Sequence, residues 1–147
     1  MFYRNLFTLW LFLFIFPSIF RLIGEKKETS IVTLSEKNLL QIIEKQKRFF
    51  NIVENSSLLS KDEMTRQAQG IATEYESYIS NNPEDIYGLI LLGKFLVRVG
   101  QEKLAIDYFM QADNMNPHLA VVKQQIANYL VQKGKPVDAF PFYILTV

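Results

Sequence analysis

The sequence repeats itself between residues 83–116, PEDIYGLILLGKFLVRVGQEKLAIDYFMQADNMN, and residues 117–147, PHLAVVKQQIANYLVQKGKPVDAFPFYILTV. The two segments align at a spacing of thirty-four residues, at which Pro83 matches Pro117 and each proline follows an Asn. A fixed period of this length is typical of a helical hairpin that is copied and stacked. We therefore expect an all-α solenoid of about two repeats, the second of them incomplete.

Each copy carries signals for the start and the end of its helices. We expect the first helix to begin at Asn82 and Pro83, where Asn caps the helix and Pro fits its first turn. The helix should end at Gly100, which suits a left-handed terminator, and Gly134 should do the same in the second copy. A return helix should cover residues 101–113.

The apolar and small residues of both copies resemble the pattern of the tetratricopeptide repeat family. The first copy supplies Leu89, Leu92, Gly93, Leu96, Ala105, Phe109, Ala112 and Pro117. The second copy supplies Ile126, Ala127, Leu130, Ala139 and Tyr143. Because Gly93 and Ala105 are small, we expect the two helices of the first hairpin to cross closely there, with large side chains such as Phe109 around the crossing.

The second copy departs from the family pattern at two positions. Lys123 stands where a large apolar residue is expected. Pro141 falls early in the second helix of this copy, where it removes a hydrogen bond and should kink or shorten the helix. We expect a less regular hairpin here than in the first copy.

Residues 34–82 predict two amphipathic helices that form a divergent or degenerate repeat. Thr33 and Glu36 have the spacing of a capping box, and so do Ser60 and Glu63. Apolar residues recur at intervals of three and four after both boxes, as on a helix with one buried face. The first of these helices should occupy the place of the missing first helix of a repeat.

Basic residues of this first helix leave two interpretations open. Lys45, Lys47 and Arg48 would let an amphipathic helix lie on anionic lipid. The same charges are typical of a solvated face on a helix that packs against the next one. We favour the solvated face, since Glu36 and Glu44 dilute the positive charge.

Residues 1–24, MFYRNLFTLWLFLFIFPSIFRLIG, predict a signal-anchor transmembrane helix. Their uncharged stretch is shorter than the about 20 residues that span a bilayer, but Arg4 and Arg21 can snorkel. A cleaved signal peptide fits less well because no Ala-x-Ala-like site follows, and a buried soluble helix is rarely apolar on all faces. The membrane contact should cover residues 6–23, and residues 25–33 should form a polar linker.

The charges that flank this helix barely distinguish its two orientations. Arg4 and the amino terminus lie on one side, and Arg21, Lys26 and Lys27 on the other side are offset by neighbouring acids. Because the tail before the helix is short, we expect a single-pass protein whose body lies outside the cytoplasm. In a bacterium, this would be the periplasmic side.

Composition narrows the class of partner. The chain has 16 Lys and Arg against 15 Asp and Glu, a net charge of +1, so we expect no binding to nucleic acid. It has no Cys, which excludes disulfides and thiolate metal sites. Its single His118 has no second His or Cys to complete a metal site, so we expect no metal and no cofactor.

Catalytic motifs are missing from the sequence. Residues 88–95, GLILLGKF, come one residue short of a Walker A motif, but Phe95 stands where Ser or Thr should hold magnesium. The segment should also lie inside a helix, whose backbone N–H groups are not free to bind phosphate. There is no supported Ser, His and Asp arrangement either. We expect a protein without enzymatic activity.

The resemblance to tetratricopeptide repeats implies a concave face that is lined by the first helix of each repeat and binds a protein or peptide. Its candidate residues here are Tyr87, Lys94, Arg98, Gln124 and Asn128. The basic and amide side chains would suit an acidic or backbone-rich peptide. An ordinary mixed surface remains the alternative interpretation.

These features predict a membrane-tethered, non-catalytic scaffold for protein–protein interaction. One alternative is a small structural subunit of a membrane protein complex, and another is a secreted soluble repeat protein. Residues 136–147 are rich in apolar side chains, and no polar capping helix follows them. We expect either a longer repeat array or self-association or docking through this segment.

Overall fold

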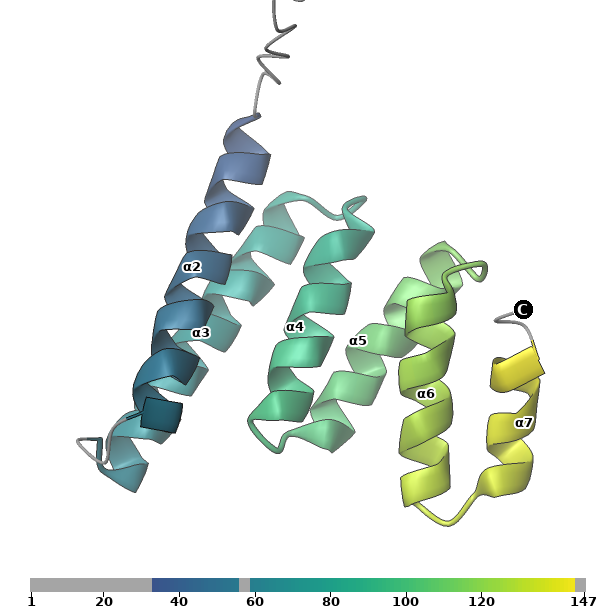
Figure 1. The fold of residues 1–147 in the computed structure, drawn as a ribbon. Coiled ribbons are helices and arrows are strands. Elements are labelled where there is room, and N and C mark those ends of the chain that lie inside the picture. The colour runs from purple at the N-terminus through teal and green to yellow at the C-terminus, as the bar shows by residue number, and fades with distance from the viewer. Residues whose placement is uncertain (1–32, 56–58, 145–147) are drawn as a thin grey trace, which may run out of the picture. The chain divides into compact units, whose positions relative to one another are not determined.

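The structure is a computed structural model that describes residues 33–55 and 59–144, which all belong to the unit Val32–Val147. Within these ranges the chain forms helices and no strand, which confirms the all-α prediction for this part of the protein (Figure 1). The predicted anchor at residues 1–24 lies outside the described residues. None of the described helices is both long and apolar enough to span a membrane.

The six described helices form three successive hairpins. Their bounds are α2 Leu34–Asn55, α3 Lys61–Asn81, α4 Ile86–Arg98, α5 Glu102–Met115, α6 Ala120–Gln132 and α7 Pro136–Ile144. The hairpins are α2–α3, α4–α5 and α6–α7, and each packs on the next through α3 against α4 and α5 against α6 (Figure 1). Helices that are neighbours in sequence are therefore neighbours in space.

Two glycines end the first helices of the second and third hairpins in the same way. Gly100 and Gly134 have φ angles of 78° and 72°, in the left-handed region. The N–H of Gln101 donates to the carbonyl of Leu96 at 2.8 Å, and the N–H of Gly100 donates to that of Val97 at 3.1 Å, which is a Schellman motif. The same two bonds recur around Gly134, so both predicted helix ends are confirmed.

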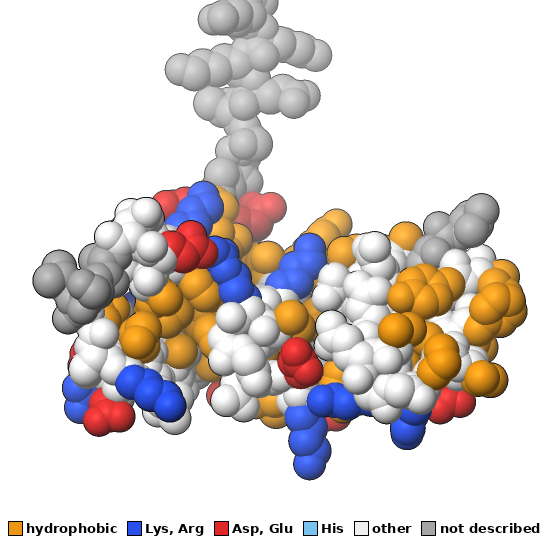
Figure 2. All heavy atoms as spheres, turned by 60° about the horizontal axis from the view of Figure 1, so that its bottom comes forward, with side chains coloured by type: hydrophobic (Ala, Val, Ile, Leu, Met, Phe, Trp, Pro, Cys, Tyr) orange, Lys and Arg blue, Asp and Glu red, His pale blue; other side chains and the backbone are white. Residues whose placement is uncertain are grey.

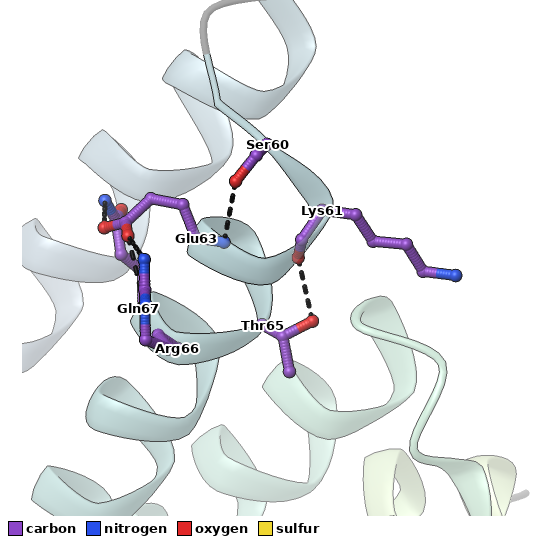
Figure 3. Close-up of polar contacts among 6 residues, drawn as sticks. All are labelled: Ser60, Lys61, Glu63, Thr65, Arg66 and Gln67. Carbon is purple, nitrogen blue, oxygen red and sulfur yellow. Dashed lines mark hydrogen bonds and ion pairs between the residues drawn. The ribbon is translucent and has the colours of Figure 1, made fainter.

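Both predicted capping boxes open a helix, but only one is reciprocal. At α2, the Glu36 N–H donates to Thr33 Oγ1 at 3.1 Å and the Thr33 N–H donates to Glu36 Oε2 at 2.7 Å. At α3, Ser60 Oγ accepts from the Glu63 N–H at 3.2 Å (Figure 3). The Glu63 carboxylate instead contacts Arg66 and accepts from Gln67 within the same helix (Figure 3).

The predicted start of α4 at Asn82 and Pro83 is wrong by a few residues. Asn82 closes α3, and its side chain donates to the carbonyl of Tyr78 at 2.8 Å. Asp85 caps α4 by accepting from the Tyr87 N–H at 2.9 Å. The proline therefore lies in the turn between the helices and not in the first turn of α4.

The α4–α5 hairpin closes around a glycine, as the small residues of the sequence predict. A Cβ atom on Gly93 would lie 2.7 Å from the ring of Phe109, so only a residue without a side chain fits there. Phe109 is buried, and so are Ala105 and Ala112 on the same helix. The contact brings the ring of one helix against the backbone of the other.

An aromatic cluster joins the first hairpin to α4. Phe95 lies among Phe49, Phe50 and Tyr75, with ring centroids 5.7 to 6.3 Å from its own. These four side chains come from α2, α3 and α4, and all are buried. The divergent helix pair is thus packed on the repeat by large rings, a stabilisation of about 0.5–1.5 kcal/mol per ring pair beyond area burial.

A polar cluster lies where α2, α3 and α4 meet. Ser35 Oγ donates to Asn82 Oδ1 at 2.7 Å and lies 3.0 Å from the Tyr78 hydroxyl. The Tyr78 hydroxyl in turn donates to the Asp85 carboxylate. The residue that caps α4 is therefore tied to the start of α2, which lies about fifty residues earlier in the chain.

Pro141 lies inside α7 without ending it. The helix continues to Ile144, three residues beyond Pro141. A proline supplies no N–H for the carbonyl one turn earlier, here that of Val137. Val137 is 83% exposed, so water can reach this carbonyl in place of the missing donor.

The close contact at Gly93 predicts opposite effects for two Gly→Ala substitutions. Gly93→Ala should destabilise the protein by about 1–3 kcal/mol because the ring of Phe109 has to move. Gly70 lies in the middle of α3, where an added Cβ would meet no other side chain or helix within 4 Å, so Gly70→Ala should stabilise the protein by about 0.5–1 kcal/mol. Urea unfolding of the full chain in detergent measures both, and equal effects would contradict the crossing.

Buried tyrosines predict a loss of stability in alkali. Burial raises the pKa of Tyr75 to about 12, and its hydroxyl donates to Gln46 Oε1 at 2.7 Å. The unfolded phenol ionises near its ordinary value of 10.0, so this contribution is complete below pH 10 and is lost as pH rises towards 12. The free energy of unfolding should fall over this window, and Tyr75→Phe should reduce the slope.

Candidate functional site

Two candidate residues on α4 face solvent along one side of the helix. Tyr87 is 66% exposed, although its N–H is held by the Asp85 cap. Lys94 is also exposed and follows Tyr87 by seven residues, or about two helical turns. No ion pair to Lys94 is formed within residues 33–55 and 59–144. Both side chains are therefore available to a partner.

Arg98, the third candidate, makes two contacts with α2. It forms an ion pair with Glu54 of α2. Its guanidinium also lies 3.7 Å from the ring centroid of Phe50, in a cation–π contact. Arg98 thus connects the end of α4 to the end of α2, and its head group is already occupied on two sides.

The two candidates on α6 also differ in whether their side chains are already hydrogen-bonded. Asn128 is exposed, but its Oδ1 accepts from the Tyr143 hydroxyl of α7 at 2.9 Å. Gln124 is exposed, and none of the side-chain hydrogen bonds found among the described residues involves it. The five candidates lie on α4 and α6, and no side-chain hydrogen bond found among the described residues joins any two of them.

The repeat positions taken from the family pattern lie almost entirely in the interior. The buried ones are Leu89, Leu92, Gly93, Leu96, Ala105, Phe109, Ala112, Ile126, Ala127 and Ala139. Leu130 is half-buried, whereas Pro117 and Tyr143 are exposed. Tyr143 occupies the position of the buried Phe109, and no described helix follows α7 to cover it as α6 follows α5.

Two basic residues of α2 form ion pairs with nearby acids. Lys47 contacts Glu44 at 2.7 Å on the same helix, and Lys45 contacts Glu74 of α3. Both pairs are solvent-exposed, so each contributes little to stability. Lys37 and Arg48 form no ion pair in the described part of the chain, so two of the four basic residues of α2 are paired with acids.

A buried ion pair was missed by the sequence analysis. Lys123 is buried, and its Nζ lies 2.8 Å from Asp113 Oδ1 of α5 and 5.4 Å from the ring centroid of Phe142 of α7. The cation therefore joins three helices from the position where an apolar residue was expected. The sequence does contain a signal for this pair. Asp113 and Lys123 occupy the positions that Ile79 and Leu89 occupy one repeat earlier, so two opposite charges replace two apolar residues.

The described residues bear on the expected lack of a metal site and on the segment that resembles a Walker A motif. No group of three or more His, Asp or Glu side chains there is placed to hold a metal ion. The segment that resembles a Walker A motif lies within α4, and Gly88 packs against Tyr78 and Ile79 of α3. Its glycines allow close helix packing and do not form a phosphate-binding loop.

Comparison with known proteins identifies no family for this chain. Neither a scan against protein-family models nor a search of the curated proteins gives a match to this chain. The resemblance to tetratricopeptide repeats therefore stays a prediction from the residues quoted above. The function has to be argued from the surface itself.

The buried ion pair predicts a strong coupling between two substitutions. Asp113→Ile alone should destabilise the protein by about 3–5 kcal/mol because it leaves the Lys123 ammonium buried without its counter-charge. The double variant Asp113→Ile with Lys123→Leu copies Ile79 and Leu89 of the preceding interface, and should recover most of this loss. Urea unfolding of the full chain measures both. Additive losses in the double variant would contradict the coupling.

Proposed function

We propose that this chain is a membrane-anchored scaffold of the tetratricopeptide type, without enzymatic activity, that binds a protein or peptide partner outside the cytoplasm. Three hairpins that pack in sequence order support the repeat architecture. The hydrophobic residues 1–24 support the anchor. The binding surface is the exposed side of α4 and α6 that carries Tyr87, Lys94 and Gln124.

The observation that carries this proposal is the exposed ring of Tyr87 in line with Lys94. Tyrosine is enriched at protein interfaces, where its ring buries a large area at a low cost in conformational entropy. Tyr87 is 66% exposed, so a partner that covers it removes apolar area from water. Few other large side chains in the described residues are as exposed.

The same residues indicate the chemistry of the partner. Lys94 provides a cation that would attract an acidic side chain or a terminal carboxylate. Gln124 provides an amide that can donate to and accept from a peptide backbone. Arg98 and Asn128 would act indirectly, since their contacts with α2 and α7 hold the flanking helices. The preferred ligand is an acidic peptide with an apolar or aromatic residue for Tyr87.

A second candidate function, a structural subunit of a membrane complex, is favoured by the surface of α7. Val137, Phe140 and Ile144 are 83%, 63% and 54% exposed at helical spacing. They form an apolar stripe along one side of α7, and Figure 2 shows hydrophobic side chains gathered at this end of the helical stack. A stripe of this kind suits a permanent contact better than reversible peptide capture.

The primary proposal predicts a loss of binding on changing the α4 surface. In Tyr87→Ala combined with Lys94→Glu, affinity for the co-purifying partner in detergent extract should fall at least about tenfold, as for an interface hot spot. Lys103→Glu is the matched control, because this lysine is exposed on α5 and lies outside the proposed surface. Thermal unfolding should be unchanged in both.

The two candidate functions separate on a further variant. Phe140→Ser combined with Val137→Ser should leave peptide capture intact if the α4 and α6 surface is the binding site. If the partner instead survives the α4 changes and is lost from this α7 variant, the structural-subunit function is correct and the scaffold proposal fails.

A further inference from the structure

The carboxylate that caps α4 contacts two helices at once. Asp85 Oδ1 accepts from the N–H of Tyr87, the exposed residue of the proposed peptide-binding surface, at 2.9 Å. Asp85 Oδ2 accepts from the hydroxyl of Tyr78 on α3. One oxygen of this carboxylate therefore holds the first turn of α4, and the other is held by the preceding helix.

The Tyr78 side chain is itself held in place. It is 5% exposed, and its ring lies so close to Gly88 of α4 that an added Cβ there would come within 3.1 Å of it. Its hydroxyl also lies 3.0 Å from Ser35 Oγ, at the start of α2. A buried ring whose hydroxyl is engaged in this way restricts the Asp85 carboxylate to one orientation.

Ser35 brings the start of α2 into the same set of contacts. Its hydroxyl donates to Asn82 Oδ1 at 2.7 Å, and the carbonyl of Asn82 accepts from the Asp85 N–H at 3.0 Å. Ser35 lies two residues after Thr33, where the predicted linker ends. The turn that precedes Tyr87 is therefore attached to the residues that follow the linker.

The next repeat shows that stacked hairpins do not require these contacts. One repeat later, Ala112 replaces Tyr78 and Leu119 replaces Asp85. Leu119 is the N-cap of α6, and no side chain accepts a hydrogen bond there. Even so, α6 begins at the position that matches the start of α4, and it packs on α5. Neither the hydroxyl nor the carboxylate is needed to start the helix or to stack it.

The turns before α4 and α6 are also held differently. Asn116 Oδ1 accepts from the N–H of His118, two residues later, at 3.0 Å, so this turn is held by its own residues. The matching oxygen of Asn82 accepts from Ser35 instead. Attachment to the start of α2 is thus particular to the turn before α4, the helix that carries the exposed Tyr87.

We propose that Tyr78 and Ser35 are positioning residues for the peptide-binding surface, through which the start of α2 controls how Tyr87 is presented. The inference rests on the proposed function, in which Tyr87 contacts the partner. With the contacts in place, the partner meets a ring on an ordered first turn, and less conformational entropy is lost on binding. When Ser35 is drawn away together with the linker, the turn is released and the affinity for the peptide falls.

Hydrogen exchange at single amides measures this positioning in the full chain without a partner. Tyr78→Phe keeps the ring and removes the hydroxyl, so exchange of the Tyr87 N–H with water, measured by NMR in detergent micelles, should speed up about fivefold or more. Tyr75→Phe is the matched control, because it removes another buried tyrosine hydroxyl, which donates to Gln46 and not to the cap of α4. It should leave the Tyr87 N–H unchanged.

The Phe95 N–H, in the middle of α4, reports opening of the whole helix in both variants. Its exchange should change no more in Tyr78→Phe than in Tyr75→Phe. An unchanged Tyr87 exchange rate in Tyr78→Phe, or an equal increase in the control, would overturn the positioning role.

A double variant tests whether the start of α2 acts through the same contacts. Ser35→Ala alone should speed exchange of the Tyr87 N–H about twofold or more. Combined with Tyr78→Phe, it should give an increase well below the product of the two single effects, because both act on one network. No effect of Ser35→Ala, or effects that multiply, would show that α2 has no part in positioning Tyr87.

Partner binding separates this inference from the proposed function. Affinity for the co-purifying partner in detergent extract should fall about three- to tenfold in Tyr78→Phe and stay unchanged in Tyr75→Phe. If Tyr87→Ala with Lys94→Glu leaves the affinity unchanged, the proposed function fails and this inference fails with it. If that variant loses the partner and Tyr78→Phe binds it normally, the proposed function stands and the positioning role is wrong.

Discussion

The contact between the ring of Phe109 and the backbone of Gly93 determines how closely α4 and α5 approach each other. Every other part of the described fold is attached to this hairpin. The first hairpin packs on α4, and the third packs on α5. A wider crossing would displace both neighbours at once, because each of them contacts one helix of the pair. The absence of a single side chain therefore sets the geometry of all three hairpins.

The two interfaces between hairpins reach similar packing by different chemistry. Between the first and second hairpins, four aromatic rings and a cluster of hydroxyl, amide and carboxylate groups hold α2 and α3 on α4. Between the second and third hairpins, Lys123 and Asp113 form a buried ion pair. Burying both charges costs desolvation, which their mutual attraction and the nearby ring of Phe142 offset. The first interface is therefore an aromatic core, and the second depends on matched charges.

Local signals in the sequence predicted most helix ends well. Contacts between residues far apart in the sequence could not be predicted in this way. Gly100 needs a left-handed conformation whatever surrounds it, and Thr33 finds its capping partner three residues away. Asn82 closes α3 and does not cap α4, and its side chain also accepts from Ser35, forty-seven residues earlier. The contacts of the candidate binding residues could not be predicted for the same reason. Nothing near Arg98 in the sequence indicates that Glu54 and Phe50 would occupy it.

The buried pair of Asp113 and Lys123 has a consequence for the order of the hairpins. If the third hairpin were moved to follow the first, Lys123 would face Ile79, and its charge would be buried against an apolar side chain. If the second hairpin were duplicated, Asp113 of the first copy would face Leu89 of the next, and the carboxylate would lose its partner. The hairpins share one backbone plan, yet they are not interchangeable modules. The pair therefore specifies which hairpin can follow which.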